Sequence, residues 1–306
     1  MARKKIIIDT DPGIDDAMAI LFALAAPDIH LIGLTTVFGN VPTRIATRNA
    51  LLLAELAGAS IPVSHGAERP LAIPPRPFAA MVHGPDGFGD VPPAEPKGAP
   101  TPIAAARHLV EACKADPGAV TICAIGPLTN LALALELDPA IAGTAAEIAI
   151  MGGSIREGGN VSAFAEANIW HDPHAAEKVF SAGWPVKLTG LDVTHRILCS
   201  GRDFEQLGRD APGPGGFLNE ASKFYLRFYA EKAGLDGCHL HDPTTIIAAL
   251  RPDLFSFETG PVSVALDGER IGETRLADTG GKSITFASGV DASAVKDLFF
   301  DTIAGS

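Results

Sequence analysis

The chain has 306 residues, 47% of them hydrophobic, which is enough for a large buried core in one large domain or two small ones. Its formal net charge of -12 argues against a nucleic-acid-binding surface, which needs a basic stripe, and against a face that binds anionic membranes. Small neutral substrates, or substrates bridged by a metal ion, remain compatible with this charge.

Two further features favour a cytoplasmic protein. The four cysteines are scattered without CxxC spacing, which predicts buried, unreactive thiols in a reducing compartment; they are Cys113, Cys123, Cys199 and Cys238. The basic start is followed by only three apolar residues before Asp9, so no export signal is predicted there. An uncharged stretch over residues 118–135 is interrupted by Gly126-Pro127 and is better interpreted as strand, turn and helix than as a membrane span.

The first part of the chain alternates between two apolar periodicities. Strands are predicted over residues 4–9, 31–38 and 61–64, and helices over residues 15–25 and 43–57. The strands are apolar throughout, which is typical of parallel strands covered on both faces. Residues 65–100 then break the pattern with nine of the 24 prolines. A loop of this length within a compact domain is usually functional, so we interpret it as a lid or an insertion at the edge of the site, with a plain surface excursion as the alternative.

The alternation returns after residue 100. Helices are predicted over residues 101–115, 128–136, 173–182 and 217–233, with strands over 120–125, 148–151 and 186–191. Residues 262–266 and the following Asp267-Gly268 indicate a β-hairpin, and Asp291 can cap a last helix that runs to Ile303. No linker or repeat is evident. We therefore expect a single α/β domain over residues 1–306, with a mostly parallel central sheet in Rossmann-like order, helices on both faces and a small C-terminal β-hairpin.

Four carboxylates, those of Asp9, Asp11, Asp15 and Asp16, lie within eight residues where the first strand ends and a helix begins. In open α/β sheets this edge binds ligands. Carboxylates this close repel one another unless a cation neutralises them, and an all-oxygen ligand set favours Ca²⁺ or Mg²⁺. Helix capping is the alternative, but it accounts for one or two acids rather than four.

The segment Asp9-Thr-Asp-Pro-Gly-Ile-Asp-Asp16 resembles the DTDPGxDD signature of the inosine-uridine-type nucleoside hydrolases. Further segments resemble the same family in order and at matching intervals: Thr35-Thr-Val-Phe-Gly-Asn40, His83-Gly, Gly126-Pro-Leu-Thr-Asn130, Met151-Gly-Gly, Asn160, Glu166-Ala-Asn168, Asp172-Pro and His241-Asp-Pro243. The resemblance covers residues 6–243 at least. It implies hydrolysis of the N-glycosidic bond of ribonucleosides, as in nucleoside salvage, by a homodimer or homotetramer.

The resemblance also implies a calcium site. Asp11, Asp16 and Asp242 would bind Ca²⁺ through their carboxylates, and Ile125 would add its backbone carbonyl. Asp11 would in addition take a proton from the attacking water, a task for which carboxylates near a cation are suited. Asp9 would orient its neighbours. This interpretation requires Asp242 to fold into one pocket with the N-terminal acids.

The remaining implied residues bind the nucleoside. Asp15 and Asn168 would hold the ribose 2′- and 3′-hydroxyls, Glu166 and Asn160 would hold the 5′-hydroxyl end, and Asn40 and Met151 would complete the ribose pocket. His241 would line the base site and assist the leaving base, and His83 in the proline-rich segment would help to close over it. Because purine-specific relatives have tryptophan where His241 stands, the histidine favours the inosine-uridine or pyrimidine-preferring type.

Several assignments stay open. His241 has a structural alternative, in which it only holds Asp242. Tyr225 and Tyr229 lie one helical turn apart and could face the base, but they are predicted to be partly core residues. Ala167 replaces an aromatic found in some relatives, and Trp170 or Phe164 are the candidates to compensate. The other seven histidines are interpreted as surface or core residues: His30, His65, His108, His171, His174, His195 and His239.

Two other functions are compatible with part of this sequence pattern. Asp9-Thr-Asp11 mimics the DxD of aspartate-nucleophile phosphatases, but the asparagine-rich residues 160–168 suit sugar hydroxyls better than a phosphate. A non-catalytic nucleoside or ribose sensor would keep the pocket but would not need Asp11. Neither GxxxxGK[ST] nor GxGxxG follows the first strand, which excludes P-loop and Rossmann cofactor binding.

Overall fold

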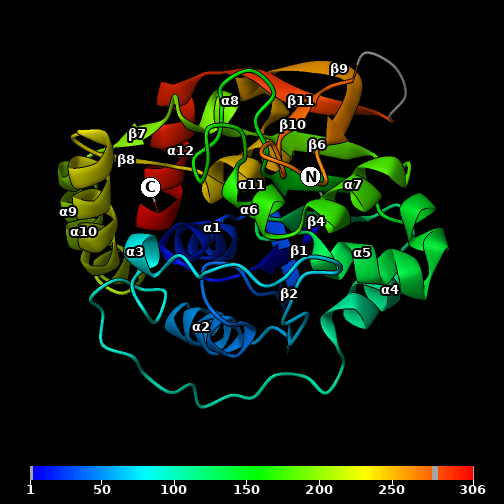
Figure 1. Cartoon of the computed structure of the whole chain (residues 1–306). Coiled ribbons are helices and arrows are strands. Elements are labelled where there is room, and N and C mark those ends of the chain that lie inside the picture. Colours follow the sequence, from blue (N-terminus) through cyan, green and yellow to red (C-terminus); the bar gives the residue numbers. More distant parts are fainter. Residues whose placement is uncertain (1–2, 278–281, 306) are drawn as a thin grey trace.

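A nine-stranded, mostly parallel sheet forms the centre of the computed structural model, which describes residues 3–277 and 282–305 (Figure 1). Its order is β10-β9-β11-β6-β5-β4-β1-β2-β3, and β7 and β8 form a separate antiparallel pair. The strands are β1 (Lys4–Thr10), β2 (Ile29–Thr36), β3 (Val63–Ser64), β4 (Val120–Ala124), β5 (Glu147–Met151), β6 (Val186–Thr189), β7 (Leu198–Cys199), β8 (Cys238–His239), β9 (Phe255–Val264), β10 (Thr274–Leu276) and β11 (Ser283–Val290).

Twelve α-helices and two 3₁₀ turns are found in the described part of the chain. The helices are α1 (Ile14–Ala25), α2 (Thr43–Leu56), α3 (Ala80–His83), α4 (Ala105–Ala115), α5 (Thr129–Leu137), α6 (Ala167–His171), α7 (Pro173–Ser181), α8 (Leu191–Thr194), α9 (Gly201–Asp210), α10 (Pro214–Ala233), α11 (Asp242–Leu250) and α12 (Ala292–Ala304), and the 3₁₀ turns are η1 (Pro139–Gly143) and η2 (Pro252–Leu254).

The predicted Rossmann-like order is confirmed, because the strands β3-β2-β1-β4-β5-β6 lie side by side and run parallel. The order reverses between β1 and β4, and at such a switch point the carboxyl ends of the two strands open a crevice. The backbone N–H of Ile125, just after β4, donates to the carbonyl of Asp9 in β1 at 2.8 Å. The acidic segment after β1 therefore starts where an α/β sheet binds ligands.

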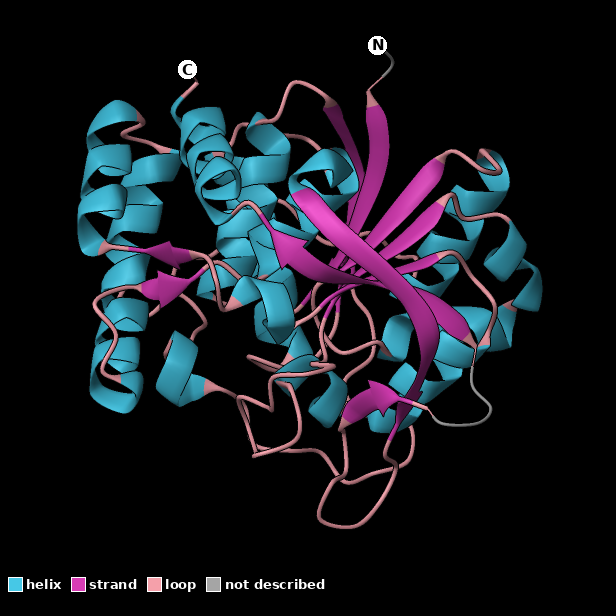
Figure 2. Cartoon of the chain, turned by 90° about the horizontal axis from the view of Figure 1, so that it is seen from above, coloured by secondary structure: helices cyan, strands magenta, loops and turns pink. Residues whose placement is uncertain are grey.

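Helices cover both faces of the twisted sheet (Figure 2). One apolar cluster joins α1 to α2, α9, α10, α11 and α12, and includes Met18, Phe22, Phe204 and Phe299. A second cluster joins α4, α5 and α7 on the other face. Every residue from Ile14 to Ala23 is buried, because α1 packs between the sheet and the helices of its own layer. The acids that begin α1 are thereby held rigidly.

The C-terminal part departs from the prediction in extent. The hairpin is present, but β9 starts at Phe255, and nine residues rather than a tight turn connect Val264 to Thr274, its partner in β10. This hairpin joins the main sheet through β11, which pairs antiparallel with β9 and parallel with β6. Asp291 caps α12 as predicted, since its side chain accepts from Ala294 N.

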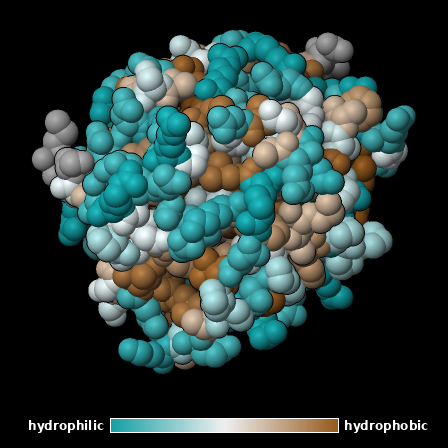
Figure 3. All heavy atoms as spheres, turned by 90° about the vertical axis from the view of Figure 1, so that its left-hand side faces the viewer, coloured by the Kyte–Doolittle hydropathy of each residue, from teal (hydrophilic) through white to brown (hydrophobic). Residues whose placement is uncertain are grey.

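The polarity of the surface and the burial of the cysteines can also be compared with the predictions from the sequence. The face carrying α9 and α10 is mostly hydrophilic with small hydrophobic patches (Figure 3). All four cysteines are buried and free, as predicted. Among the described residues, no helix is both long and apolar enough to cross a membrane.

Candidate active site

The turn after β1 directs three carboxylates inward. Asp16, in the first turn of α1, accepts hydrogen bonds from Thr10 Oγ1 (2.5 Å), Gly13 N (2.9 Å) and Asn40 Nδ2 (3.0 Å). Its bond to Gly13 N ties the start of α1 to the residue before it, so the helix-capping interpretation is correct for this residue. Capping does not account for its neighbours, because Oδ1 of Asp11 and Oδ1 of Asp15 are buried without a hydrogen-bond partner.

Asp11 sits in a cradle of glycines. Its Oδ2 accepts from the backbone N–H of Asn40 at 2.6 Å. A Cβ added to Gly39 would lie 2.0 Å from Oδ2, and one added to Gly126 would lie 2.5 Å from Oδ1. The two loops that follow β2 and β4 therefore need glycine at these points to admit the carboxylate. Asp11 is thereby held by the backbone, with Oδ1 left free.

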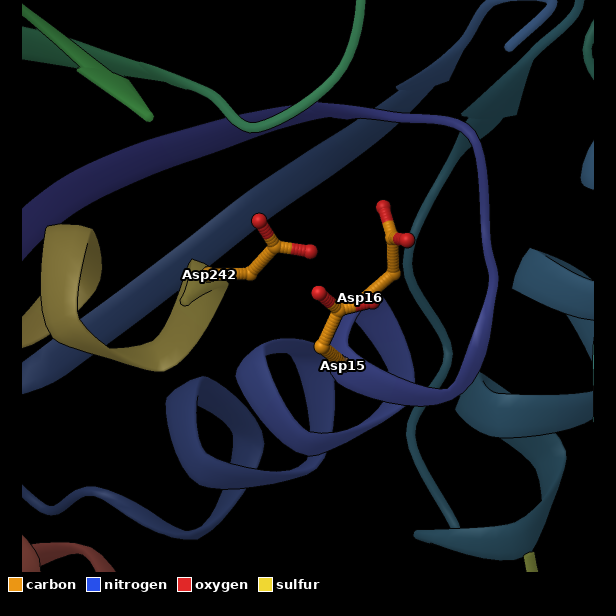
Figure 4. Close-up of side chains that lie close together, drawn as sticks. All are labelled: Asp15, Asp16 and Asp242. Atoms are coloured by element: carbon orange, nitrogen blue, oxygen red, sulfur yellow. The ribbon is translucent and has the colours of Figure 1, made fainter. Parts of the chain in front are cut away.

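Asp242 lies beside the N-terminal acids although more than two hundred residues separate them. Ligand oxygens of Asp15, Asp16 and Asp242 all lie within 4.8 Å of one another, and all three residues are buried. Their carboxylates converge from the first turns of α1 and α11 (Figure 4). Asp11 is not a member of this group, whereas the resemblance placed Asp11 rather than Asp15 among the ligands.

In the protein without a bound cation, the buried carboxylates repel one another. Burial raises the pKa of Asp15 to about 6, and burial together with the charge of Asp15 raises the pKa of Asp16 to about 6. Burial and the neighbouring carboxylates hold the pKa values of Asp11 and Asp242 well above their usual range. A divalent cation would relieve this repulsion, and the all-oxygen donors suit a hard ion. The buried acidic triad therefore fits a metal ion.

A cavity of about 380 Å³ opens above the acids. Ten of the residues predicted for the site line it: Asp15, Asn40, His83, Ile125, Met151, Asn160, Glu166, Asn168, His241 and Asp242. Asp11 and Asp16 do not contribute to the lining, because they are almost fully buried. The volume is in the range of small-molecule pockets.

One wall of the cavity is organised by Glu166. This carboxylate caps α6, accepting from the backbone N–H groups of Asn168 (2.9 Å), Ile169 (3.1 Å) and Gly153 (2.9 Å). Burial nevertheless raises its pKa to about 7. Asn168 then donates through Nδ2 to the carbonyls of Ile125 (3.1 Å) and Met151 (3.2 Å). The Ile125 carbonyl, predicted as a ligand of the cation, therefore accepts a hydrogen bond from Asn168.

Asn160 lies at the mouth of the cavity. It is exposed, and its Oδ1 accepts from Ala167 N at 3.0 Å, so its Nδ2 is left for another partner. Asp9 is below the floor: its Oδ1 accepts from Thr35 Oγ1 (2.5 Å) and Asn130 Nδ2 (2.8 Å), and burial raises its pKa to about 7. These contacts tie β1 to β2 and α5, in keeping with a role in orienting its neighbours.

His83 closes the cavity from the proline-rich segment. Its Nδ1 accepts from Ile14 N at 3.1 Å, and its ring stacks on Tyr225 with centroids 5.4 Å apart. Nδ1 also lies 3.8 Å from Asp15 Oδ1, but a nitrogen that accepts an N–H carries no proton, so this contact is not an ion pair. Burial lowers the pKa of His83 to about 4, which keeps the ring neutral.

His241 is embedded in a hydrogen-bonded chain opposite the acids. Its Nδ1 lies 2.8 Å from Thr194 Oγ1, and its Nε2 lies 2.9 Å from the Tyr229 hydroxyl. The Tyr229 oxygen is 3.4 Å from that of Tyr225, which donates to Asp15 Oδ2 at 3.2 Å. Burial, with the neighbouring imidazoles, lowers the pKa of His241 well below its usual range.

Two tyrosines and two histidines contribute more to the cavity than the sequence predicts. Tyr225 is buried as predicted for a core residue, yet its hydroxyl contacts Asp15, and Tyr229 lines the cavity. His195 and His239, interpreted as surface or core residues, also line it, with ring centroids 4.7 Å apart. The interpretation of these two histidines was wrong. No local sequence pattern distinguishes a histidine that lines a cavity from one on the surface or in the core. The spacing of Tyr225 and Tyr229, which places them on one face of a helix, was the one signal available in the sequence.

The substitution of Ala167 is not offset by the aromatics that were considered. Ala167 lines the cavity, whereas Trp170 and Phe164 do not. Trp170 instead packs under Arg76 at 3.9 Å, and Phe164 under Arg270 at 4.1 Å. Phe228 of α10 is the phenylalanine that lines this cavity.

Comparison with known proteins agrees with this geometry. The family model described as inosine-uridine preferring nucleoside hydrolase matches residues 6–297. The chain is 44% identical to uridine nucleosidase 1 of Arabidopsis thaliana, over 92% of this chain and 83% of that protein. It is 36% identical to the inosine-uridine preferring nucleoside hydrolase of Crithidia fasciculata, over 87% and 85%. A solved plant nucleoside hydrolase superposes with a TM-score of 0.95 at 41% identity, covering 99% of each chain.

The chain belongs to the inosine-uridine preferring nucleoside hydrolase family. It is accordingly a ribonucleoside hydrolase, an enzyme that acts on the N-glycosyl bond of ribonucleosides.

Proposed function

We propose that the enzyme is calcium-dependent and is of the type that prefers inosine and uridine, or of the type that prefers pyrimidine nucleosides. One observation carries the calcium assignment: the buried carboxylates of Asp15, Asp16 and Asp242 converge on one point, with further unpartnered carboxylate oxygen on Asp11 and Asp15. All three of these residues offer carboxylate oxygen as the ligand, and Ca²⁺ favours such donors over softer ones. The presence of a histidine at position 241 supports the base preference.

We assign Asp11, Asp16, Asp242 and the Ile125 carbonyl to the cation, and Asp15 to the sugar. The proximity of Asp15 to Asp16 and Asp242 makes it the alternative ligand. Asp15 also lines the cavity, as do Asp242 and Glu166, whereas Asp11 is held below it. A carboxylate that contacts the cavity is in reach of the ribose hydroxyls, and this contrast supports the division of roles.

The reaction would pass through a ribosyl group with oxocarbenium character. A cation bound here would supply positive charge that lowers the pKa of water. Asp11, with its free Oδ1, would accept the proton of the attacking water. Asp15 and Asn168 would hold the 2′- and 3′-hydroxyls, Glu166 and Asn160 the 5′-hydroxyl end, and Asn40 and Met151 the remaining ring contacts. Their oxygens would stabilise positive charge near C1′.

At the other end of the cavity, His241 and His83 would face the departing base. Both rings are neutral at pH 7, because burial lowers their pKa values. A neutral imidazole stabilises a departing anion by donating a hydrogen bond. The base would then leave with its negative charge partly neutralised, and solvent would complete its protonation.

The test is a substrate panel. Release of base from uridine, inosine, cytidine and adenosine is measured with added calcium and with a chelator. We expect uridine or inosine to give the highest kcat/KM and the chelator to abolish turnover. Full activity in the chelator would overturn the calcium assignment. Cleavage of p-nitrophenyl phosphate in place of p-nitrophenyl riboside would favour the phosphatase alternative, and nucleoside binding without base release would favour a sensor.

We also expect a homodimer or homotetramer in the cytoplasm that serves nucleoside salvage. The assembly rests on the resemblance to the family, and the compartment rests on the buried free thiols. Sedimentation velocity at micromolar concentration measures the first, and a monomer would contradict it.

A further inference from the structure

One hydrogen bond at the base end lies outside the cavity lining. Thr194 is the last residue of α8 and is fully buried. Within the described residues, the hydrogen bond recorded for its hydroxyl is the one to His241 Nδ1, at 2.8 Å. The residue has no contact with the cavity. Its chemistry therefore reaches the substrate only through His241.

The count of donors along this chain determines which nitrogen of His241 carries hydrogen. Asp15 at one end accepts only, so the Tyr225 hydroxyl donates to it. Tyr229 then donates to Tyr225 and accepts from His241 Nε2–H. His241 Nδ1 is left as an acceptor, and the Thr194 hydroxyl donates to it. Every hydrogen in this arrangement has an acceptor.

The opposite tautomer leaves one donor unsatisfied. If Nδ1 carried the hydrogen, it would donate to Thr194 Oγ1, and the Thr194 hydroxyl would lose its acceptor. A buried hydroxyl without an acceptor costs free energy, because it has lost its bond to water without replacement. Low local polarity makes this penalty larger, and the residues concerned are all buried or nearly so.

We infer that Thr194 is a positioning residue, which fixes the His241 ring with its hydrogen on Nε2, on the side of Tyr229 and the cavity. The inference rests on the proposed role of His241 toward the departing base. In this tautomer a neutral His241 carries a hydrogen on Nε2 that Tyr229 accepts and that a departing base would accept in its place; in the other tautomer Nε2 would offer only a lone pair, which repels a departing anion. Two contacts hold the ring, one at each nitrogen.

α8 is suited to this task because one of its side chains anchors it to a neighbouring loop. Asp192, two residues before Thr194, accepts from the backbone N–H groups of Ile155 and Arg156, each at 2.8 Å. The N–H of Thr194 donates to Gly190 O at 3.2 Å. The same short helix thus holds both the loop that leads to Asn160 and the ring of His241.

The test compares two leaving groups. Uracil leaves poorly unless its charge is stabilised, whereas p-nitrophenolate is a stable anion that needs no donor. We expect Thr194→Val to lower kcat/KM for uridine by roughly 10- to 100-fold, as when a partner that orients a functional histidine is lost. Hydrolysis of p-nitrophenyl riboside should change by less than about 3-fold. Thr194→Ser keeps the hydroxyl and should restore most of the uridine activity.

Thr121→Val is the matched control, since Thr121 is also buried but its Oγ1 has no hydrogen-bond partner and lies in β4, away from the cavity. It should leave both activities unchanged. The decisive variant combines Thr194→Val with His241→Ala. If Thr194 acts through His241, the added substitution costs nothing further for uridine. The inference would be overturned if the double variant hydrolysed uridine more slowly than His241→Ala alone. Equal losses for both substrates in Thr194→Val would also overturn it.

The tautomer is measured directly in the unmodified enzyme by ¹⁵N NMR of labelled histidine, with the His241 signals identified by their absence in His241→Ala. A protonated Nε2 and an unprotonated Nδ1 are expected, and the reverse pattern would overturn the inference even if Thr194→Val failed to fold. A distinct outcome is reserved for the proposed function: if His241→Ala retained full uridine hydrolysis, the role of His241 itself would be wrong.

Discussion

The two ends of the cavity face the same physical problem and solve it differently. At the acidic end, burial raises the pKa values of Asp15, Asp16 and Asp242 above their ordinary range, so that their ionisation is costly. At the base end, burial lowers the pKa values of His83 and His241, which favours neutral rings. Low polarity opposes charge in both places. Neutral imidazoles function as they are, whereas carboxylates must ionise to act.

The consequence is an asymmetry in what each end requires. At the base end, the hydroxyl and imidazole groups of one chain bond to one another from Thr194 to Asp15. The acidic end keeps carboxylate oxygens without a partner and needs a cation. Changes at the acidic end should therefore affect metal binding and all substrates together, and changes at the base end should affect substrates according to their leaving group.

Removal of calcium should have the largest effect. A chelator is expected to reduce base release from uridine to background, and re-added calcium to restore it. Magnesium in place of calcium sharpens the assignment, because Mg²⁺ demands stricter geometry and should restore less activity. Activity that survives prolonged chelation would remove the distinction between the two ends.

Calcium should also reverse the pH dependence of stability. Acids with raised pKa values, about 6 for Asp15 and Asp16 and about 7 for Glu166, bind more protons in the folded than in the unfolded state. The metal-free protein therefore loses stability as pH rises through about 4 to 7. Calcium binds the ionised form, so the rise in Tm on adding calcium should grow from about pH 5 to about pH 8. An increment independent of pH would contradict the buried acids as its ligands.

Asp11→Asn should lower kcat by about 10²–10⁴-fold, equivalent to roughly 3–5 kcal/mol of barrier, while the protein stays folded. The loss should be similar for uridine and for p-nitrophenyl riboside, because both substrates need the activated water whichever group leaves. Asp28→Asn, on an exposed residue, serves as the control and should behave as wild type. Near-normal turnover of Asp11→Asn would exclude Asp11 as the base.

Tyr229→Phe should have a smaller and selective effect. It removes the hydroxyl that contacts His241 Nε2 at 2.9 Å, a bond whose loss should lower kcat/KM for uridine roughly 10-fold. Hydrolysis of p-nitrophenyl riboside should change little. Equal loss for both substrates would show that Tyr229 supports the cavity as a whole rather than its base end.

Asn160→Ala should have the smallest effect, a rise in KM of a few-fold with kcat nearly constant, which corresponds to about 1 kcal/mol from one exposed hydrogen bond. The substrate 5′-deoxyuridine provides the check. If Asn160 holds the 5′-hydroxyl end, the variant and the wild type should have the same KM for this substrate. A difference that persists would place Asn160 elsewhere.

Much of the acidic end was predictable because it is local. Asp11, Asp15 and Asp16 belong to one continuous turn between β1 and α1, and the pattern of carboxylates around Pro12-Gly13 indicates both the turn and its charge. The Rossmann-like order of the first six strands was likewise accessible, because alternating strands and helices leave few arrangements. The extent of β9, the helix α11 and the loop to β10 were not, since their boundaries depend on the strands that they pack against.

The base end was decided by tertiary structure. Thr194, Tyr229 and His241 come from three segments with no shared periodicity, and His195 and His239 look like ordinary isolated histidines in the sequence. They meet because α8, α10 and the β7–β8 pair converge around one cavity. A sequence specifies such a contact only through the whole fold, whereas a run of acids within a single turn carries its own electrostatic signature. The N-terminal acids of the candidate metal site were therefore evident from eight residues, Asp242 was assigned to it only through the resemblance to the family, and the partner that orients His241 was evident only in three dimensions.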